Sequence, residues 1–367
     1  MSTRTLIVLA GVVGLIALAA VTQPALSAAP AAGVGPKLQS GGPLTFGPND
    51  ILFIADNQGA AIYALEMGSR VSGSAPGTKN IPGVDRQIAG LVGTDAREIQ
   101  INDLAINPRS RNAFISVSRG RGAGALPVLV RVDGAGKLDV ISLAEVRYTM
   151  VALPNPPEAN PGSTRDSRAQ SVTDMAYVDG RLFIAGLSNE EFSSKLRSVP
   201  YPFTEVDRGT SVEIWHSSHG QFETQSPVYT FVPYNVGGEQ NLIAGYLCTP
   251  LVKFPISQLK PGAKVMGTTI AELGNRNRPL DMIVYKKDGK DYLLMSNTSR
   301  GVMKIPTQDF ARQPGLKQPV SDKAGIAYET VAQLKGVEQL DLLDDQHAIV
   351  IARTDAGMAN LEAIALP

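Results

Sequence analysis

Three aspartates occupy the same place in three similar apolar stretches: Asp103 in NDLAI, Asp174 in TDMAY and Asp281 in LDMIV. Each stands where a β-type segment begins. Carboxylate oxygens that converge in space could coordinate Ca²⁺ or another divalent metal. Alternatively, the same carboxylates could accept hydrogen bonds from backbone N–H groups of their own turn or of a neighbouring repeat. The sequence leaves both interpretations open.

A second group of candidates follows apolar segments further along each repeat. Asn57, Asn189 and Glu190 offer oxygen ligands and hydrogen-bonding groups, whereas three arginines offer guanidinium groups that suit carboxylates and phosphates. Those arginines could instead only neutralise the aspartates. We expect the following six residues to bind a ligand: Asn57, Arg119, Asn189, Glu190, Arg300 and Arg353.

The histidines and the single cysteine give weaker signals. His216 and His219 form an HxxH pattern, but a strand that runs into a glycine turn surrounds them, not the helix of HExxH enzymes. Cys248 would need a nearby base to act as a nucleophile, and we expect no histidine beside it. We therefore interpret Cys248 as a buried small residue. The chain contains no GxSxG elbow, phosphate loop or dinucleotide fingerprint.

A degenerate repeat organises these candidates. An apolar triplet recurs six times, at intervals of 51 to 69 residues: 53–55, 114–116, 183–185, 242–244, 293–295 and 350–352. A turn and another strand-like stretch precede each triplet, and a third strand-like stretch follows it. Repeats of about 50–65 residues with about four strands are typical of propeller blades. The sequence therefore predicts an all-β fold, a six-bladed β-propeller with four-stranded antiparallel blades.

The repeat also predicts where the candidates meet. The first strand of a blade begins at the face to which the second strand returns, so these positions share one mouth of a central tunnel. The last repeat ends at Pro367 without a fourth strand. We expect residues 30–42 to form a linker that includes this closing strand, at 34–40, and residues 43–367 to form the propeller.

Several segments resemble a known group of proteins. LTFGPNDILFIADNQGAAIYAL, SVTDMAYVDGRLFIAG and LDMIVYKKDGKDYLLMSNTSRGVMKI are similar to repeats of six-bladed propellers of the NHL, gluconolactonase/regucalcin-like and strictosidine synthase-like group. The resemblance covers nearly all of residues 30–367 and implies the fold. Gluconolactonase-like hydrolases hold a divalent ion in the tunnel through Glu, Asn and Asp. This chain has Leu44 and Thr45 where that Glu would stand.

The N-terminus and the overall charge suggest a compartment. Residues 1–29 contain a basic start, an apolar run from Leu6 to Val21 and small residues near Ala29, which is typical of a signal peptide. We therefore expect a periplasmic or secreted protein. Lys plus Arg and Asp plus Glu are each 34, and this balance argues against a nucleic-acid partner. With one cysteine, no intramolecular disulfide can form.

The sequence leads to two functional hypotheses. The first is an exported, monomeric propeller that binds a small molecule or a partner protein at the tunnel mouth, because no complete catalytic set is present. The second is a metal-dependent hydrolase of the lactonase or esterase type that uses Asp103, Asp174 and Asp281.

Overall fold

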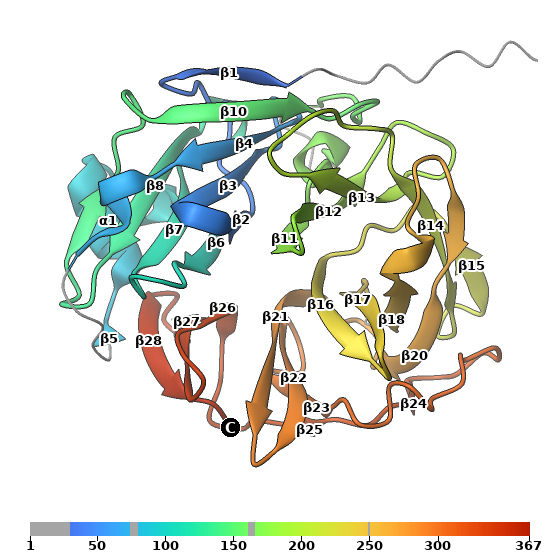
Figure 1. The fold of residues 1–367 in the computed structure, drawn as a ribbon. Helices are drawn as coiled ribbons and strands as arrows, with labels where there is room; N and C mark the ends of the chain where they lie inside the picture. Colours follow the sequence, from blue (N-terminus) through green and yellow to red (C-terminus); the bar gives the residue numbers. More distant parts are fainter. Residues whose placement is uncertain (1–29, 74–79, 161–165, 249) are drawn as a thin grey trace, which may run out of the picture.

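The computed structural model describes residues 30–73, 80–160, 166–248 and 250–367. The signal peptide expected at residues 1–29 lies outside them. Six antiparallel sheets surround a central tunnel, and the innermost strand of each sheet faces the axis (Figure 1). This arrangement confirms the six-bladed β-propeller.

The six sheets are the six blades, numbered along the chain. Blade 1 contains β2 (Leu44–Phe46), β3 (Ile51–Asp56) and β4 (Ala61–Glu66), then β10 (Arg147–Ala152) and β1 (Ala31–Val34). Blade 2 contains β6 (Ile99–Ile106), β7 (Ala113–Arg119), β8 (Leu126–Val132) and β9 (Leu138–Val140). Blade 3 contains β11 (Asp174–Val178), β12 (Arg181–Leu187), β13 (Ser194–Pro200), β14 (Thr210–His216) and β15 (Gln221–Glu223), with β19 (Lys264–Met266) beside β14.

The remaining blades follow the same plan. Blade 4 contains β16 (Thr230–Val236), β17 (Glu239–Gly245), β18 (Pro250–Pro255), β20 (Thr268–Leu273) and β24 (Lys323–Gly325). Blade 5 contains β21 (Pro279–Lys287), β22 (Lys290–Asn297), β23 (Met303–Pro306) and β25 (Glu329–Thr330). Blade 6 contains β26 (Val337–Leu342), β27 (His347–Arg353), β28 (Ala359–Ala365) and β5 (Asn80–Ile81). The six predicted triplets all lie in second strands.

The second strands are continuous apolar runs because neighbouring blades cover both of their faces. In β3, alternate residues face opposite neighbours. Phe53 packs in a core shared with Ile184 of blade 3, whereas Ile54 packs in a core shared with Phe114 of blade 2. Blade 1 therefore lies between blades 2 and 3, and its apolar side chains stabilise both contacts.

The order of the blades around the ring departs from their order in the sequence. First strands are neighbours in the pairs β2–β6, β6–β26, β26–β21, β21–β16, β16–β11 and β11–β2. The ring therefore reads 1, 3, 4, 5, 6, 2, and blade 2 stands between blades 6 and 1. Figure 1 shows β6 and β7 on the side of β2 and β3 away from β11 and β12.

Two long connections produce this order. After β4, the chain reaches the outer edge of blade 6 as β5, where Ile81 pairs with Leu361. It then forms α1 (Val84–Val92) and blade 2. From there it returns along the outer edge of blade 1 as β10, where Val151 pairs with Ile62. The chain then enters blade 3. It therefore passes from blade 2 to blade 3 along the outer side of blade 1.

These connections correct the expected closure. Residues 34–40 were predicted to supply the fourth strand of blade 6, but that strand is β5. The segment Ala31–Val34, at the start of this region, instead forms β1, which pairs with β10 at the edge of blade 1. The backbone N–H groups of Gln39 and Ser40 donate to Asp56 at the end of β3. Because blade 2 separates blade 1 from blade 6, this segment cannot reach blade 6.

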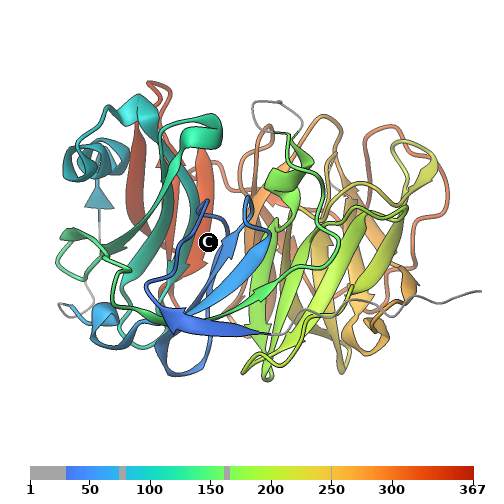
Figure 2. The same ribbon diagram turned by 90° about the horizontal axis from the view of Figure 1, so that it is seen from above.

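Helices are few among the described residues. The helix α1 packs against β6, β9 and β28 on the outside of the ring (Figure 2). Short 3₁₀ turns are η1 (Pro48–Asp50), η2 (Gly68–Val71), η3 (Ala96–Glu98), η4 (Gly122–Gly124), η5 (Ser167–Gln170) and η6 (Ile256–Gln258). The loop 188–193 contains bends. Within the described chain, no helix has the length and hydrophobicity to cross a membrane.

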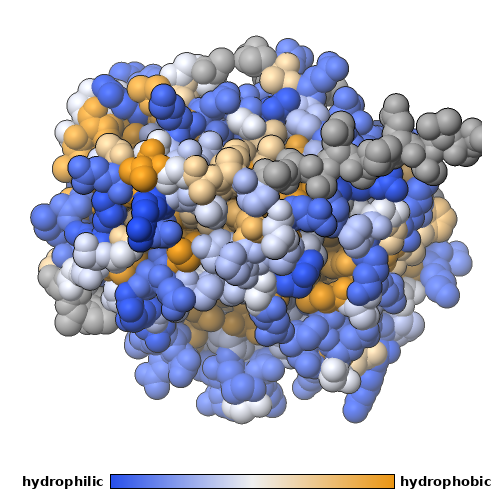
Figure 3. Space-filling view, turned by 45° about the horizontal axis from the view of Figure 1, so that its top comes forward, coloured by the Kyte–Doolittle hydropathy of each residue, from blue (hydrophilic) through white to orange (hydrophobic). Residues whose placement is uncertain are grey.

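Hydrophobic side chains form small, separate patches on the face shown in Figure 3, and hydrophilic side chains cover most of it. The largest exposed apolar side chains of the described residues come from different parts of the ring, among them Val34, Leu91, Leu126 and Phe222. Isolated apolar residues are ordinary on a protein surface.

Candidate functional site

A cavity of ≈ 450 Å³ opens at the end of the tunnel where first strands begin. Its polar lining is mainly uncharged. Among the described residues, Arg278 is the one Lys, Arg, Asp or Glu that lines it. Carboxamides and hydroxyls make up most of the polar groups, from Gln39, Ser40, Asn57, Gln58, Gln100, Asn102, Ser118, Gln170 and Thr173. This is the mouth that the repeat predicted, and we call it the mouth cavity.

The predicted aspartates lie one step deeper along the tunnel. Asn102, Thr173 and Leu280 line the mouth cavity, and the next residue of each strand lines a second cavity of ≈ 530 Å³. Asp103, Asp174 and Asp281 therefore share one cavity, together with Asp341 from β26. The strand starts bring the three predicted carboxylates together, and they add a fourth.

Each of these four carboxylates connects two blades. Asp103 accepts hydrogen bonds from Leu104 N–H of its own strand, at 2.8 Å, and from Leu44 N–H of blade 1, at 2.6 Å. The same pattern, with one bond within the strand and one to the next blade, recurs at Asp174 with Phe231, at Asp281 with Leu340 and at Asp341 with Ile106. The aspartates therefore accept backbone hydrogen bonds, the second interpretation that the sequence allowed.

Gln339 lies between two of the carboxylates. In the orientation that fits the hydrogen-bond network, its side-chain nitrogen is 2.8 Å from Asp103 Oδ1 and 3.2 Å from Asp281 Oδ2. An amide nitrogen donates two hydrogen bonds, so Gln339 satisfies both acceptors. A metal ion shared by Asp103 and Asp281 would have to lie between them, next to this side-chain nitrogen.

Burial and mutual repulsion shift these carboxyl groups towards their neutral form. Burial raises the pKa of Asp174 to about 7 and that of Asp341 to about 6. Burial also raises the pKa of Asp103 and of Asp281 well above the usual value, and the negative charges of the neighbouring aspartates add to the rise. Backbone hydrogen bonds oppose the shift in all four. The tunnel therefore holds carboxyl groups that titrate at higher pH than ordinary ones.

The predicted ligand-binding residues do not share one place. Asn57 lines the mouth cavity, and its amide donates to Ala169 O and Val172 O, which holds blade 1 against the segment before blade 3. The lining of the mouth cavity does not include the other five. Arg119 points instead to Gly93 O, at the end of α1. The expectation that all six surround one mouth is therefore wrong.

Each of the other four residues has a polar partner outside the mouth. Arg300 forms an ion pair with Asp322 at 2.8 Å. Arg353 binds both oxygens of Glu338 at 2.8 Å each. Glu190 pairs with the buried Lys195 at 2.6 Å, and Asn189 N–H donates to Asn155 O. The sequence showed the residues after each second strand, but it did not show the local carboxylates that hold the two arginines.

A second polar cluster lies on the outside of the ring. His216 ends β14 and His219 follows in the turn to β15, so the two histidines lie on an outer hairpin of blade 3. Cys248 comes from the turn between β17 and β18. One nitrogen of each histidine and the Cys248 sulfur lie within 4.8 Å of one another. The expectation that no histidine lies beside Cys248 is therefore wrong, and these three residues could hold a metal.

Comparisons with known proteins leave the family open. No family model matches this chain, and no curated protein sequence matches it.

Solved structures resemble it only distantly. One called glucose dehydrogenase has a TM-score of 0.37 at 10% identity, over 92% of this chain and 100% of that chain. A PQQ-bound aldose sugar dehydrogenase from Streptomyces coelicolor has a TM-score of 0.28 at 10% identity, over 92% and 98%. An engineered GH43 glycoside hydrolase has a TM-score of 0.38 at 10% identity, over 74% of this chain and 51% of that one, so the match spans about half of its length. At this distance, none of these matches carries an argument about chemistry.

Asp341 and Gln339 are the tunnel residues whose roles the sequence analysis missed. Asp341 lies two residues after Gln339 in β26, where it pairs with Ile349 of β27. The signal was present, because Asp341 stands before Leu342 just as Asp103 stands before Leu104.

Proposed function

We propose that this chain is an exported β-propeller that binds an uncharged, hydroxyl-rich small molecule, such as a sugar or polyol, in the mouth cavity. The lining of that cavity carries the proposal. Of the lining side chains that the structure describes, six are carboxamides, three are Ser or Thr hydroxyls, and Arg278 is the one that is permanently charged.

Carboxamides suit such a ligand because each one both donates and accepts hydrogen bonds, as a ligand hydroxyl also does. A charged ligand would need an opposite charge, and within the described lining only Arg278 offers one. Tyr229 adds an aromatic face to the same cavity, with the Arg278 guanidinium 5.8 Å from the ring centre. The volume of ≈ 450 Å³ is in the range of small-molecule sites. Because the site is concave, we prefer a small molecule to a partner protein.

The alternative, a hydrolase built on the tunnel carboxylates, has less support. Both oxygens of each aspartate already accept backbone N–H groups, and Gln339 contacts two of the aspartates. A metal would compete with these bonds. Removing them would expose backbone donors of two blades, at a cost of about 1–3 kcal/mol for each unsatisfied group.

Titration calorimetry with a panel of neutral sugars and polyols tests the proposal, with sugar phosphates and sugar acids as charged comparisons. The account expects saturable binding of at least one neutral compound. A double variant, Gln39→Ala with Gln170→Ala, should weaken that binding about tenfold or more, because it removes two hydrogen-bonding side chains from the lining. Gln313→Ala is the matched control, since Gln313 lies outside the cavity. Binding of charged compounds only, or equal binding by the double variant, would contradict the proposal.

Export and the monomeric state belong to the same proposal. Expression with the intact N-terminus in a bacterial host should give a mature chain that begins near residue 30 and is recovered outside the cytoplasm. Intact-mass spectrometry of the fractions measures this, and size-exclusion chromatography with light scattering measures the oligomeric state. A full-length chain retained in the cytoplasm would contradict export.

A further inference from the structure

A histidine pair lies beside the cysteine at the outer edge of blade 3. The rings of His216 and His219 have their centres 3.9 Å apart. His216 is 1% exposed, whereas the His219 side chain is 43% exposed. One ring is therefore fixed within the protein, and the other can adjust at the surface.

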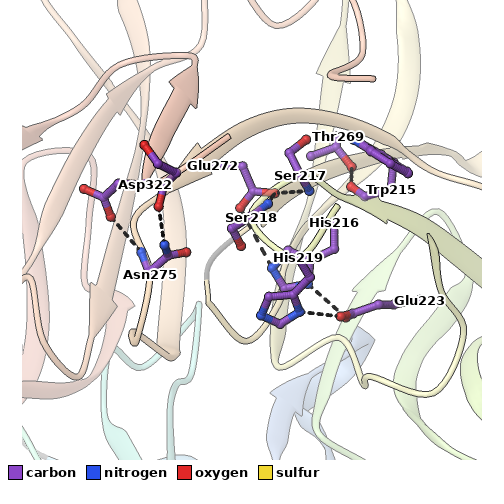
Figure 4. Close-up of polar contacts among 11 residues, drawn as sticks. Trp215, His216, Ser217, Ser218, His219, Glu223, Thr269, Glu272, Asn275 and Asp322 are labelled. Carbon is purple, nitrogen blue, oxygen red and sulfur yellow. Dashed lines mark hydrogen bonds and ion pairs between the residues drawn. The ribbon is translucent and has the colours of Figure 1, made fainter. Parts of the chain in front are cut away.

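One carboxylate orients both rings. Glu223 Oε1 lies 2.7 Å from His219 Nδ1, and Glu223 Oε2 lies 2.9 Å from His216 Nδ1 (Figure 4). This leaves the Nε2 atom of each ring for another partner. A carboxylate that holds the far nitrogen of an imidazole is the usual outer partner of a metal-binding histidine, because it fixes the ring and strengthens its remaining lone pair.

Three buried atoms of His216 and Glu272 have no hydrogen-bond partner among the described residues: His216 Nδ1, His216 Nε2 and Glu272 Oε2. Of these, His216 Nε2 and Glu272 Oε2 lie 4.0 Å apart. Glu272 is 1% exposed, and its other oxygen accepts from Ser217 N–H at 2.7 Å. Buried polar atoms in proteins are nearly always paired. An unpaired nitrogen beside a second buried carboxylate points to a cation as the missing partner.

Cys248 completes the set. Its backbone has φ of 59°, in the left-handed region that non-glycine residues avoid. The conformation is held by a 2.7 Å hydrogen bond from Cys248 N–H to Asn277 O of the neighbouring segment. A strained backbone at a reactive side chain often serves to position that side chain. Here it presents the thiol to the two histidines.

We propose that His216 Nε2, His219 Nε2 and the Cys248 thiolate bind one Zn²⁺ ion. Imidazole and thiolate are ligands that zinc prefers, and three protein ligands with one open position is the arrangement of exchangeable zinc sites. Tetrahedral zinc needs its ligand atoms somewhat closer than 4.8 Å, and the exposed His219 can move to provide this.

His216 and His219 help to line a cavity of ≈ 460 Å³. Its lining also includes Phe222 and Leu247, which are 57% and 42% exposed. A water molecule or a small ligand with an apolar part in this cavity would lie beside the two histidines. This site is on the outside of the ring and independent of the mouth cavity, so the two proposals can fail separately.

Metal titration of the purified full-length chain tests the zinc site. After chelation, we expect one equivalent of Zn²⁺ to bind, and Co²⁺ in its place should give the near-ultraviolet absorption of a cobalt–thiolate bond. Cys248→Ser should abolish that absorption, and His219→Ala should abolish tight binding. Glu223→Gln should weaken zinc binding by about 10- to 100-fold, as an outer partner does.

His347→Ala is the matched control, because His347 is paired with Asp344 in a turn of blade 6. It should bind zinc as the unmodified chain does. Circular dichroism checks that each variant is folded, and the exposed His219 makes its variant the safest one. The proposal is overturned if Cys248→Ser or His219→Ala binds Zn²⁺ as tightly as the unmodified chain, or if His347→Ala weakens binding equally.

Discussion

At the scale of single residues, the aspartates of the tunnel act as connectors between blades. Their spacing suggested a metal site, and the same spacing equally suits a bond to the next blade. In the structure each carboxylate accepts one N–H of its own strand and one of the neighbouring blade, as the second interpretation expects. The sequence predicted which residues converge. It could not predict which backbone groups would reach them, since those groups come from blades that are far apart in the chain.

The raised pKa of Asp174 predicts how stability changes with pH. Its folded pKa of about 7 lies above the usual pKa of 3.8 for an aspartate, so its contribution to stability is complete below pH 4 and is lost as the pH rises through the folded pKa. The free energy of unfolding should therefore fall between pH 5 and pH 8.

Asp174→Asn removes this titration. Urea unfolding at pH 5 and pH 8 should show a larger fall in the free energy of unfolding for the unmodified chain than for the variant. Asp345→Asn is the control, because Asp345 is exposed in a turn and should leave the fall unchanged. An identical fall in Asp174→Asn and the unmodified chain would show that Asp174 does not carry the effect.

At the scale of elements, strands were predictable and their partners were not. The triplets found every second strand because a buried strand is a local pattern of apolar residues. Whether β1 or β5 completes blade 6 depends on which blades are neighbours, and no local pattern records this. The proximity of Cys248 to His216 was missed for the same reason, because they belong to different blades.

The helix α1 gives a prediction at this scale. Ile88 is fully buried in the core between blades 2 and 6, whereas Leu91 on the same helix is 50% exposed. Ile88→Ala should lower the free energy of unfolding by about 2–5 kcal/mol, and Leu91→Ala should change it by about 0.5 kcal/mol or less. Urea unfolding measures both. Equal effects would mean that α1 is not packed through Ile88.

At the scale of the whole molecule, the non-sequential order of blades ties the ring together. The segment after blade 1 closes blade 6, and the segment after blade 2 closes blade 1. Blades 1, 2 and 6 therefore cannot separate without breaking strands of one another. A closed ring leaves no exposed strand edge at its innermost strands. The strands that the chain adds to other blades also cover edges on the outside of the ring.

A disulfide across the closure tests this arrangement. Asn80 and Glu362 are paired residues of β5 and β28, so their Cα atoms are close enough for a disulfide. Asn80→Cys with Glu362→Cys, in a Cys248→Ser background, should oxidise readily and stabilise the protein by about 2–4 kcal/mol. Non-reducing electrophoresis and thermal unfolding report the result.

The control for closure is Asn80→Cys with Lys304→Cys, because Lys304 lies on blade 5. That pair should stay reduced under the same conditions. If the control pair forms the bond and the Glu362 pair does not, β5 does not close blade 6.

The most direct test is a high-resolution crystal structure of the protein grown with both CaCl₂ and ZnCl₂. If the tunnel aspartates connect blades and the metal chemistry lies elsewhere, Gln339 will stand between Asp103 and Asp281, and a zinc anomalous peak will mark His216, His219 and Cys248. A Ca²⁺ ion bound by oxygens of Asp103 and Asp281 at about 2.3–2.6 Å, with Gln339 displaced, would contradict the account.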